Sequence, residues 1–238
     1  MEFAEKMKPW QRYLGIFWAC YCGFGGTLIK LIIQSVPALS TNQIVSGIMS
    51  NMYIIPYILL LVSFVPVIFK PLKQQKAKKI ILWSMIISFL YIVFSFFMGA
   101  LESVLFRYFF GQSVPHNSND EDLLSNLHSP DKLTSILFII LVCVIGPLIE
   151  EISYRICLFG TLRKKHRILS HLITALLFGF QHVSTAVILS NRPQEILYIF
   201  SYMGFSLLMT IMYKKLKTPV PGIIAHMLCN TIGVFTSH

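Results

Sequence analysis

Seven long apolar runs constrain the fold of this 238-residue chain more than any other feature. They lie at residues 11–35, 44–69, 80–106, 133–162, 168–190, 194–213 and 219–236. A membrane-spanning helix needs about 20 mostly apolar residues. Charged residues make up only 13% of the chain, against about a quarter in soluble domains. The sequence therefore predicts an all-α, polytopic membrane helix bundle with about seven transmembrane helices.

Basic residues gather in every second connection between these runs. The basic connections contain Lys6, Lys8, Arg12, Lys70, Lys73, Lys76, Lys78, Lys79, Arg163, Lys164, Lys165, Arg167, Lys214, Lys215 and Lys217, which is 15 of the 20 Lys and Arg residues. Because cytoplasmic loops are enriched in Lys and Arg, we expect the N-terminus in the cytosol and the C-terminus on the other side. The net charge of +10 is thus explained by the basic loops that we expect on the cytosolic side. The sequence shows no basic surface interleaved with aromatic residues, which is the pattern that would indicate a nucleic-acid partner.

No linker or repeat divides the chain, so we expect one transmembrane domain over residues 1–238. Its first part, 1–132, contains three spans without a chemical motif, and the part from 133 to 238 contains the polar motifs. The first apolar run has no small-residue cleavage site nearby, which predicts a retained helix. The five cysteines lie inside apolar runs without the spacing of a zinc site, and we expect them to be buried apolar residues.

The fourth apolar run contains two adjacent carboxylates and an arginine, in the string GPLIEEISYRICLFG. An ionised side chain at the centre of a bilayer costs at least about 2.5 kcal/mol, so such residues are usually paired or functional. Glu151 and Arg155 are four residues apart with the acid first, which is the favourable order for an ion pair. Glu150 is rotated by about 100° from Glu151 and has no such partner. We expect Glu150 to be available for acid–base chemistry, and a purely structural buried pair is the alternative.

The fifth and seventh apolar runs each contain a pair of co-facial residues. Phe178 and His182 lie in FGFQHV, and His226 and Asn230 lie in HMLCNTIG. A lone histidine in a helix is more often a satisfied core residue than a catalyst. However, Glu150, His182 and His226 all lie roughly 14 to 22 Å along their helices from the basic loops, at 1.5 Å per residue. We therefore expect them to converge on one polar cavity that opens toward the cytosol.

The three motifs are Glu-Glu-x-x-x-Arg, Phe-x-x-x-His and His-x-x-x-Asn, in that order on separate membrane helices. Together they resemble the CAAX protease and bacteriocin-processing family of intramembrane peptidases, also called the CPBP or Abi family. The resemblance covers the chain from about Leu137 to its C-terminus. It implies an intramembrane endopeptidase that hydrolyses a peptide bond of a membrane-associated peptide or protein. The substrate would be a CAAX-type protein, a peptide pheromone or a bacteriocin precursor. The protein would lie in a cell membrane, and the compact size of the chain suggests a bacterial plasma membrane.

The resemblance also implies roles for the residues of the first two motifs. Glu150 would be the catalytic glutamate, and His182 the histidine that helps it to activate water. Glu151 and Arg155 would hold the geometry of the site. Amide hydrolysis does need a base for the attacking water, which agrees with this assignment.

The third motif, by the same resemblance, would stabilise the oxyanion of the tetrahedral intermediate through His226 and Asn230. We expect a mechanism without a cofactor. A zinc ion bound by Glu150, His182 and His226 is the alternative, because family members have also been described as metalloproteases. The chain has no His-Glu-x-x-His motif.

Two other functions compete with peptide hydrolysis. One is a non-enzymatic protein on the same scaffold, such as a bacteriocin self-immunity protein or a membrane regulatory partner. The other is a proton-coupled transporter, which the absence of repeated halves makes the weaker alternative. The expected partners are the lipid bilayer and the peptide substrate, and the sequence makes no prediction about oligomeric state.

Overall fold

The computed structural model describes residues 7–36, 58–59, 61–64, 77–111, 113, 117–128 and 130–236, and all regular structure within them is helical. Five helices are long and apolar enough to cross a membrane: Pro9–Ser35, Ala77–Phe110, Lys132–Leu162, Leu169–Ile188 and Pro193–Leu216. A sixth apolar helix, Val220–Thr236, has 17 residues. The predicted run at 44–69 lies almost wholly outside the described residues. The helical fold of a multi-pass membrane protein is thus confirmed, while seven spans and their orientation stay predictions.

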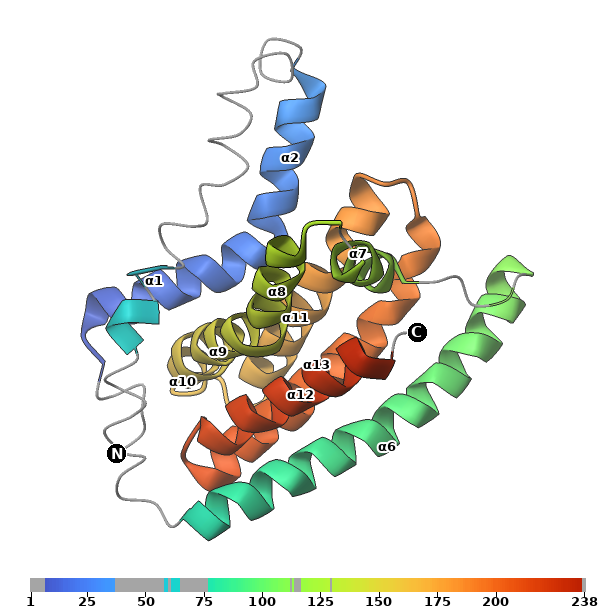
Figure 1. Cartoon of the computed structure of the whole chain (residues 1–238). Helices are drawn as coiled ribbons and strands as arrows, with labels where there is room; N and C mark the ends of the chain where they lie inside the picture. The colour runs from blue at the N-terminus through green and yellow to red at the C-terminus, as the bar shows by residue number, and fades with distance from the viewer. Residues whose placement is uncertain are drawn as a thin grey trace.

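The first span is bent. It consists of α1 (Pro9–Cys20), a π-helical turn η2 (Tyr21–Gly25) and α2 (Gly26–Ser35). A π-turn interrupts the regular backbone hydrogen bonds and is a recognised cause of a kink. In Figure 1, α1 and α2 meet at an angle at this turn. As a result α1 packs against the helix Lys132–Leu162, called the fourth span here after its apolar run, whereas η2 packs against α11 (Leu169–Ile188).

The fourth span contains two π-helical segments. Its parts are α8 (Lys132–Ile140), η3 (Leu141–Ile145), α9 (Gly146–Glu150), η4 (Glu151–Phe159) and α10 (Gly160–Leu162). Pro147 has no backbone N–H, and the wide turn of η3 directly before it accommodates the missing hydrogen bond. All nine residues of η4 are buried. The Glu-Glu-x-x-x-Arg motif therefore lies at the junction of α9 and η4, inside the bundle.

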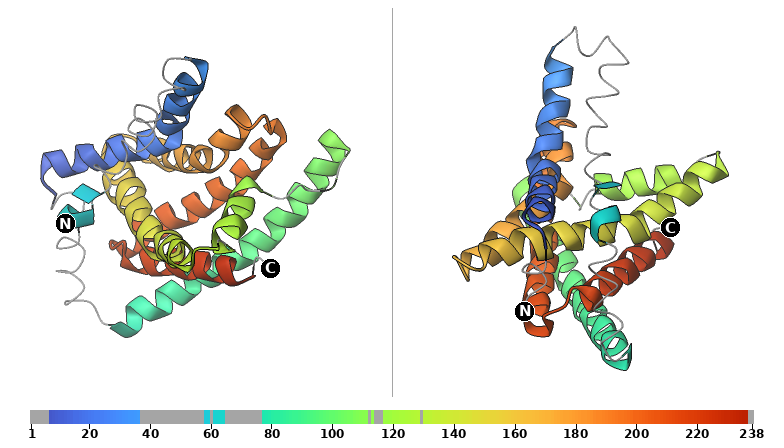
Figure 2. Two further views of the ribbon diagram at one scale, coloured as in Figure 1. Left: turned by 45° about the horizontal axis from the view of Figure 1, so that its top comes forward. Right: turned by 90° about the vertical axis from the view of Figure 1, so that its left-hand side faces the viewer.

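Four further helical segments complete the bundle around this span. They are α6 (Ala77–Phe110), α11 (Leu169–Ile188), α12 (Ile199–Leu216) with the preceding 3₁₀ turn η5 (Pro193–Tyr198), and α13 (Val220–Thr236). Helix α11 packs along α12, and α13 packs along α6. Both views of Figure 2 show the first span and α6 on opposite sides of the central helices. The free face of α6 exposes large apolar side chains such as Phe96 and Val104, as a lipid-facing helix requires.

Two glycines allow α12 to approach its neighbours closely. A Cβ atom at Gly204 would overlap the ring of Phe94 in α6. A Cβ atom at Gly179 in α11 would lie 2.9 Å from side-chain atoms of Ile199 and Met203. Small residues at helix contacts are usual in membrane proteins, where close packing replaces the hydrophobic effect between helices. These contacts fix α12, and with it the polar residues that α12 presents to the site.

Candidate active site

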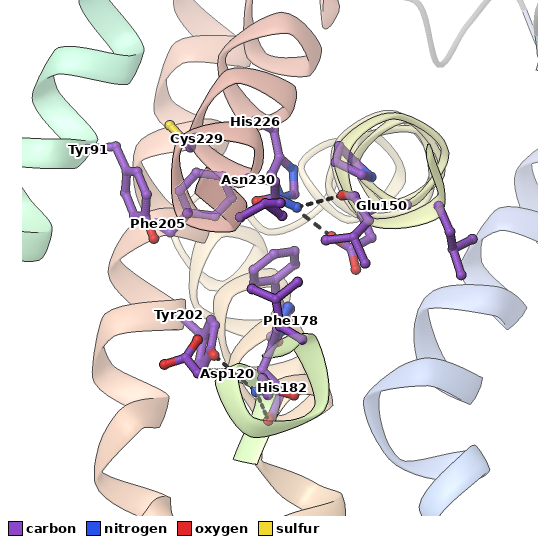
Figure 3. A pocket seen from close by; sticks show the side chains of 18 of the residues that line it. Tyr91, Asp120, Glu150, Phe178, His182, Tyr202, Phe205, His226, Cys229 and Asn230 are labelled. Atoms are coloured by element: carbon purple, nitrogen blue, oxygen red, sulfur yellow. Dashed lines mark hydrogen bonds and ion pairs between the residues drawn. The ribbon is translucent and has the colours of Figure 1, made fainter. Parts of the chain in front are cut away.

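The six candidate residues gather around one cavity of about 520 Å³. Four of them line it: Glu150, His182, His226 and Asn230. Glu151 and Arg155 lie behind this wall and are 1% and 0% exposed. Figure 3 shows the lining side chains, which come from the fourth span, α11, α12 and α13 and also from α6 and α7. The fold thus brings the three motifs together, while the catalytic role of each residue stays a prediction.

A chain of polar contacts joins the first and third motifs. The Nε atom of Arg155 lies 3.1 Å from Oε2 of Glu151, which confirms the predicted ion pair. The other oxygen of Glu151, Oε1, lies 3.2 Å from Nδ1 of His226. Because a carboxylate accepts, Nδ1 carries the hydrogen, and this fixes the ring with Nε2 directed at Glu150. The Nε2 atom of His226 lies 3.6 Å from Oε2 of Glu150.

Glu150 is the carboxylate that reaches the cavity, and its side chain is 14% exposed. Gln181 donates a hydrogen bond of 2.6 Å from Nε2 to Oε1 of Glu150. The sequence patterns gave no role to this glutamine. The only signal for Gln181 was its position three residues after Phe178, which places both side chains on neighbouring parts of one face of α11.

His182 lies at the other end of the cavity. Figure 3 shows the ring of Phe178 between His182 and the Glu150–His226 pair. The Nδ1 atom of His182 donates to the carbonyl oxygen of Phe178 at 2.8 Å, so Nε2 is the ring nitrogen left for a ligand. The ring of Tyr202 stacks on His182 with centroids 4.2 Å apart. We expected His182 beside Glu150, but the contacts of Glu150 are with Gln181 and His226.

Asn230 lies one helical turn beyond His226 on α13 and faces the same cavity. Its Nδ2 atom donates to the carbonyl oxygen of Val142 at 3.0 Å. A side-chain amide has two N–H hydrogens, so one stays available to a bound ligand. The bond to Val142 also orients the amide, which is what a donor for a developing oxyanion requires.

A short polar helix, α7 (Ser118–Leu127), closes the cavity at the His182 end. Asn119, Asp120 and Leu123 of α7 line the cavity. The Nδ2 atom of Asn119 lies 2.8 Å from the carbonyl oxygen of His182 and 3.0 Å from Oη of Tyr202. We expected this segment to be part of a loop between two apolar runs, because a ten-residue polar helix carries no membrane signal.

The cavity extends from Glu150 and His226 toward α7, away from the basic loops. None of the residues that line it belongs to the helix ends next to loops 163–168 and 214–219. On the basic side the bundle is filled by buried side chains, namely the Glu151–Arg155 pair, Tyr154 and Phe159. The described lining therefore does not extend to the basic loops, and an opening toward the cytosol stays a prediction. That prediction considers depth along single helices and leaves out the volume of the first motif itself.

Among the described residues, no three His, Cys, Asp or Glu side chains are arranged to bind a metal ion. The zinc alternative required Glu150, His182 and His226 to share one ion. Phe178 lies between His182 and the other two side chains. The donor set does not fit a zinc site, so no step of the mechanism below involves a metal.

Comparison with protein families matches residues 132–232 to a type II CAAX prenyl endopeptidase Rce1-like family. Neither the curated proteins nor the solved structures contain a match. The matched segment begins with α8 and ends within α13. It includes all three motifs, whereas the first span, α6 and α7 lie outside it. Residues 132–232 of this chain form an Rce1-like type II CAAX prenyl endopeptidase domain, a member of the CPBP (Abi) family of peptidases.

Proposed function

We propose that this chain is an intramembrane endopeptidase that hydrolyses a peptide bond of a membrane-associated peptide or protein. One observation carries the proposal. Of two adjacent buried carboxylates, Glu151 is neutralised by Arg155, and Glu150 faces the cavity without a basic side chain of Lys or Arg among its described contacts. A structural ion pair needs only one of the two acids. The peptidase family of residues 132–232 supports the same reading.

In the proposed reaction, Glu150 acts as the general base for a water molecule. The 3.6 Å between Oε2 of Glu150 and Nε2 of His226 is too long for a direct hydrogen bond, and polar atoms at such separations are commonly bridged by water. Glu150 takes a proton from this water as the oxygen attacks the peptide carbon. The proton then passes to the leaving amine as the C–N bond breaks.

Donors on the cavity wall would stabilise the oxyanion that forms. The free amide hydrogen of Asn230 lies on one side of the cavity, and Nε2 of His226 would be a second donor when the ring carries a hydrogen on both nitrogens, because Nδ1 already donates to Glu151. His182 presents Nε2 from the α7 end, where it binds the peptide or the water near it. Removal of one such donor typically lowers kcat by about 10²- to 10³-fold.

The walls of the cavity favour an apolar peptide segment. Between the two polar ends the cavity is lined by Phe138, Leu141, Val142, Phe205 and Val234. About 520 Å³ holds a few side chains, so the substrate enters as an extended segment and not as a folded domain. We propose that the basic loops face the cytosol, as the positive-inside rule predicts, and that α7 faces the opposite side of the membrane.

The test is cleavage in proteoliposomes. The probes are a quenched fluorescent peptide with a farnesylated CAAX end, its unlipidated twin, and a mass-spectrometric library of apolar peptides. We expect the wild type to cleave and Glu150→Gln to lose at least about 10³-fold in kcat/KM, because an amide of the same shape accepts no proton. Glu102→Gln is the matched control. Glu102 is also a buried glutamate, but it binds Ser201 away from the cavity.

Three outcomes would contradict parts of the proposal. Wild-type rates in purified Glu150→Gln would remove Glu150 from the chemistry. No cleavage of any probe by the wild type would favour the non-enzymatic alternative. Loss of activity with a chelator, restored by zinc, would overturn the mechanism without a metal.

A further inference from the structure

The shortest described polar contact of the Glu150 carboxylate comes from a variable position of the second motif. Gln181 lies 2.6 Å away through Nε2. Its other end, Oε1, lies 2.6 Å from Oη of Tyr154. The hydroxyl of Tyr154 lies 3.0 Å from the carbonyl oxygen of Ala19 as well. These contacts form a relay from Tyr154 through Gln181 to Glu150, with Ala19 of the first span as a second acceptor for the single hydroxyl hydrogen of Tyr154.

The direction of the Gln181 amide follows from its neighbours. With Oε1 toward Tyr154, the hydroxyl donates and the amide NH₂ donates to the carboxylate. In the reversed orientation two oxygens, one of Gln181 and one of Glu150, would face each other at 2.6 Å, which is repulsive while Glu150 is ionised. Tyr154 and Ala19 are fully buried, so water does not compete for the bonds that orient Gln181.

We propose that Gln181, held by Tyr154, is a positioning residue for Glu150. Rotation of a carboxylate about its last bond is soft, and both oxygens would otherwise be equivalent. Gln181 holds Oε1, so that Oε2 is the oxygen directed at His226 and the bridging water. This inference rests on the proposed function of Glu150 as the base. It also gives the first span, which lies outside the family segment, a part in the site.

The position of Gln181 separates its effect on catalysis from any effect on binding. Gln181 does not line the cavity, so its side chain is behind Glu150 as seen from the substrate. Its removal should leave KM nearly unchanged and lower kcat. Misplacement of a catalytic group by about 1 Å can lower the rate by about 10²-fold.

The experiment compares purified full-length variants in the proteoliposome assay. We expect Gln181→Leu, which has a similar shape, to lower kcat by about 10- to 100-fold with KM within about twofold. Ser184→Ala is the matched control. Ser184 also lies on α11, and its replacement by Ala removes a buried contact of 2.8 Å with Thr27 of the first span. This contact does not involve Glu150. We expect this control to keep the wild-type kcat.

A double-mutant cycle distinguishes a relay from general structural damage. Tyr154→Phe should lower kcat in the wild-type background and add little in the Gln181→Leu background, because its effect passes through Gln181. Multiplicative losses would overturn the relay. So would a wild-type kcat in Gln181→Leu, or a change in KM alone, when Glu150→Gln is inactive. If Glu150→Gln itself keeps activity, the proposed function fails instead, and the two failures are thus distinguishable.

Discussion

At the Glu150 end of the cavity the polar side chains are buried and charged, whereas at the α7 end they are largely neutral or exposed. Glu151, Arg155 and His226 are all at most 4% exposed, and Glu151 contacts both of the others. Asn119 of α7 is exposed and makes neutral hydrogen bonds. Removing one member of a buried charged network leaves the others unpaired, whereas exposed contacts exchange readily with water. The cavity thus has one fixed wall, where we place the chemistry, and one wall that opens at lower cost.

The α7 end has a single buried charged anchor among its described contacts. Oε2 of Glu195, which is 1% exposed, accepts from the backbone N and the Oγ of Ser118 at 3.2 and 2.7 Å. Arg192 pairs with Glu195 at 3.3 Å and with Glu121 at 2.8 Å, and the side chains of Arg192 and Glu121 are 37% and 46% exposed. The hydrogen bonds of Arg192 with Glu121 and Glu195 raise the pKa of its guanidinium, so it is charged at any working pH. These contacts hold the start of α7 and leave the rest to neutral bonds.

The largest expected difference between the two ends is in stability. Arg155→Leu leaves Glu151 buried without its counter-charge, which typically costs about 3–5 kcal/mol. We expect a sharp fall in Tm in detergent or a failure to accumulate. Arg192→Leu removes a partner that is 37% exposed, and the buried Glu195 keeps both hydrogen bonds from Ser118, so we expect a smaller fall in Tm. Thermal unfolding of the two purified variants measures the difference.

A double variant sharpens this test. Replacing both Glu151 and Arg155 with Leu removes the pair without leaving a lone charge, and such replacements are often neutral or stabilising. We expect its Tm to lie above that of Arg155→Leu, although the protein should be inactive because His226 loses its partner. Equal losses of Tm in Arg155→Leu and Arg192→Leu would show that the two ends do not differ.

Hydrogen exchange of α7 should respond next most strongly. Asn119→Ala removes the contacts with the His182 carbonyl and with Tyr202. Two neutral hydrogen bonds contribute about 1–2 kcal/mol together when partly exposed, which corresponds to exchange about 5- to 30-fold faster in α7 alone. Exchange mass spectrometry of peptides from α7, η4 and α13 measures this.

Thr231→Ala is the control for the exchange experiment. Thr231 bonds only within its own helix, to the carbonyl oxygen of Met227, as far as its described hydrogen bonds go. Its loss should leave α7 unchanged. Faster exchange in η4 or α13 of the Asn119 variant would mean that both walls open as one unit, against the division proposed here.

Local helix geometry explains which parts of the site were predictable. The Glu151–Arg155 pair, and the shared faces of Phe178 with His182 and of His226 with Asn230, follow from residues four apart on a helix. For the six runs that the structure describes, the ends agree with the helices to within four residues, because hydropathy marks where a chain leaves the membrane.

Contacts between helices were not predictable from these patterns. Gln181 reaches Glu150 only because α11 lies against the fourth span with a particular rotation. The π-helical segments η3 and η4 change that rotation, and no residue pattern used above marks them. The cover formed by α7 is likewise a tertiary feature, set by Asn119 bonding to two other helices.

The smallest expected effect concerns the joint between α7 and α8. Asp131 caps α8 by accepting from the backbone N of Leu133 at 3.1 Å and of Thr134 at 3.2 Å. Hydrogen bonds from Thr134 and Leu133 to the ionised carboxylate hold the pKa of Asp131 below its usual value of 3.8. A group with a lowered pKa in the folded state stabilises the fold above the unfolded pKa, and the effect is lost as pH falls through the folded pKa.

Amides at the start of α8 should therefore lose some protection below about pH 4 in hydrogen exchange, after correction for intrinsic exchange. Asp131→Asn keeps a capping oxygen that does not titrate, so its protection should not change over the same range. An equal loss in this variant, or no loss in the wild type, would show that the Asp131 cap does not control the protection of these amides.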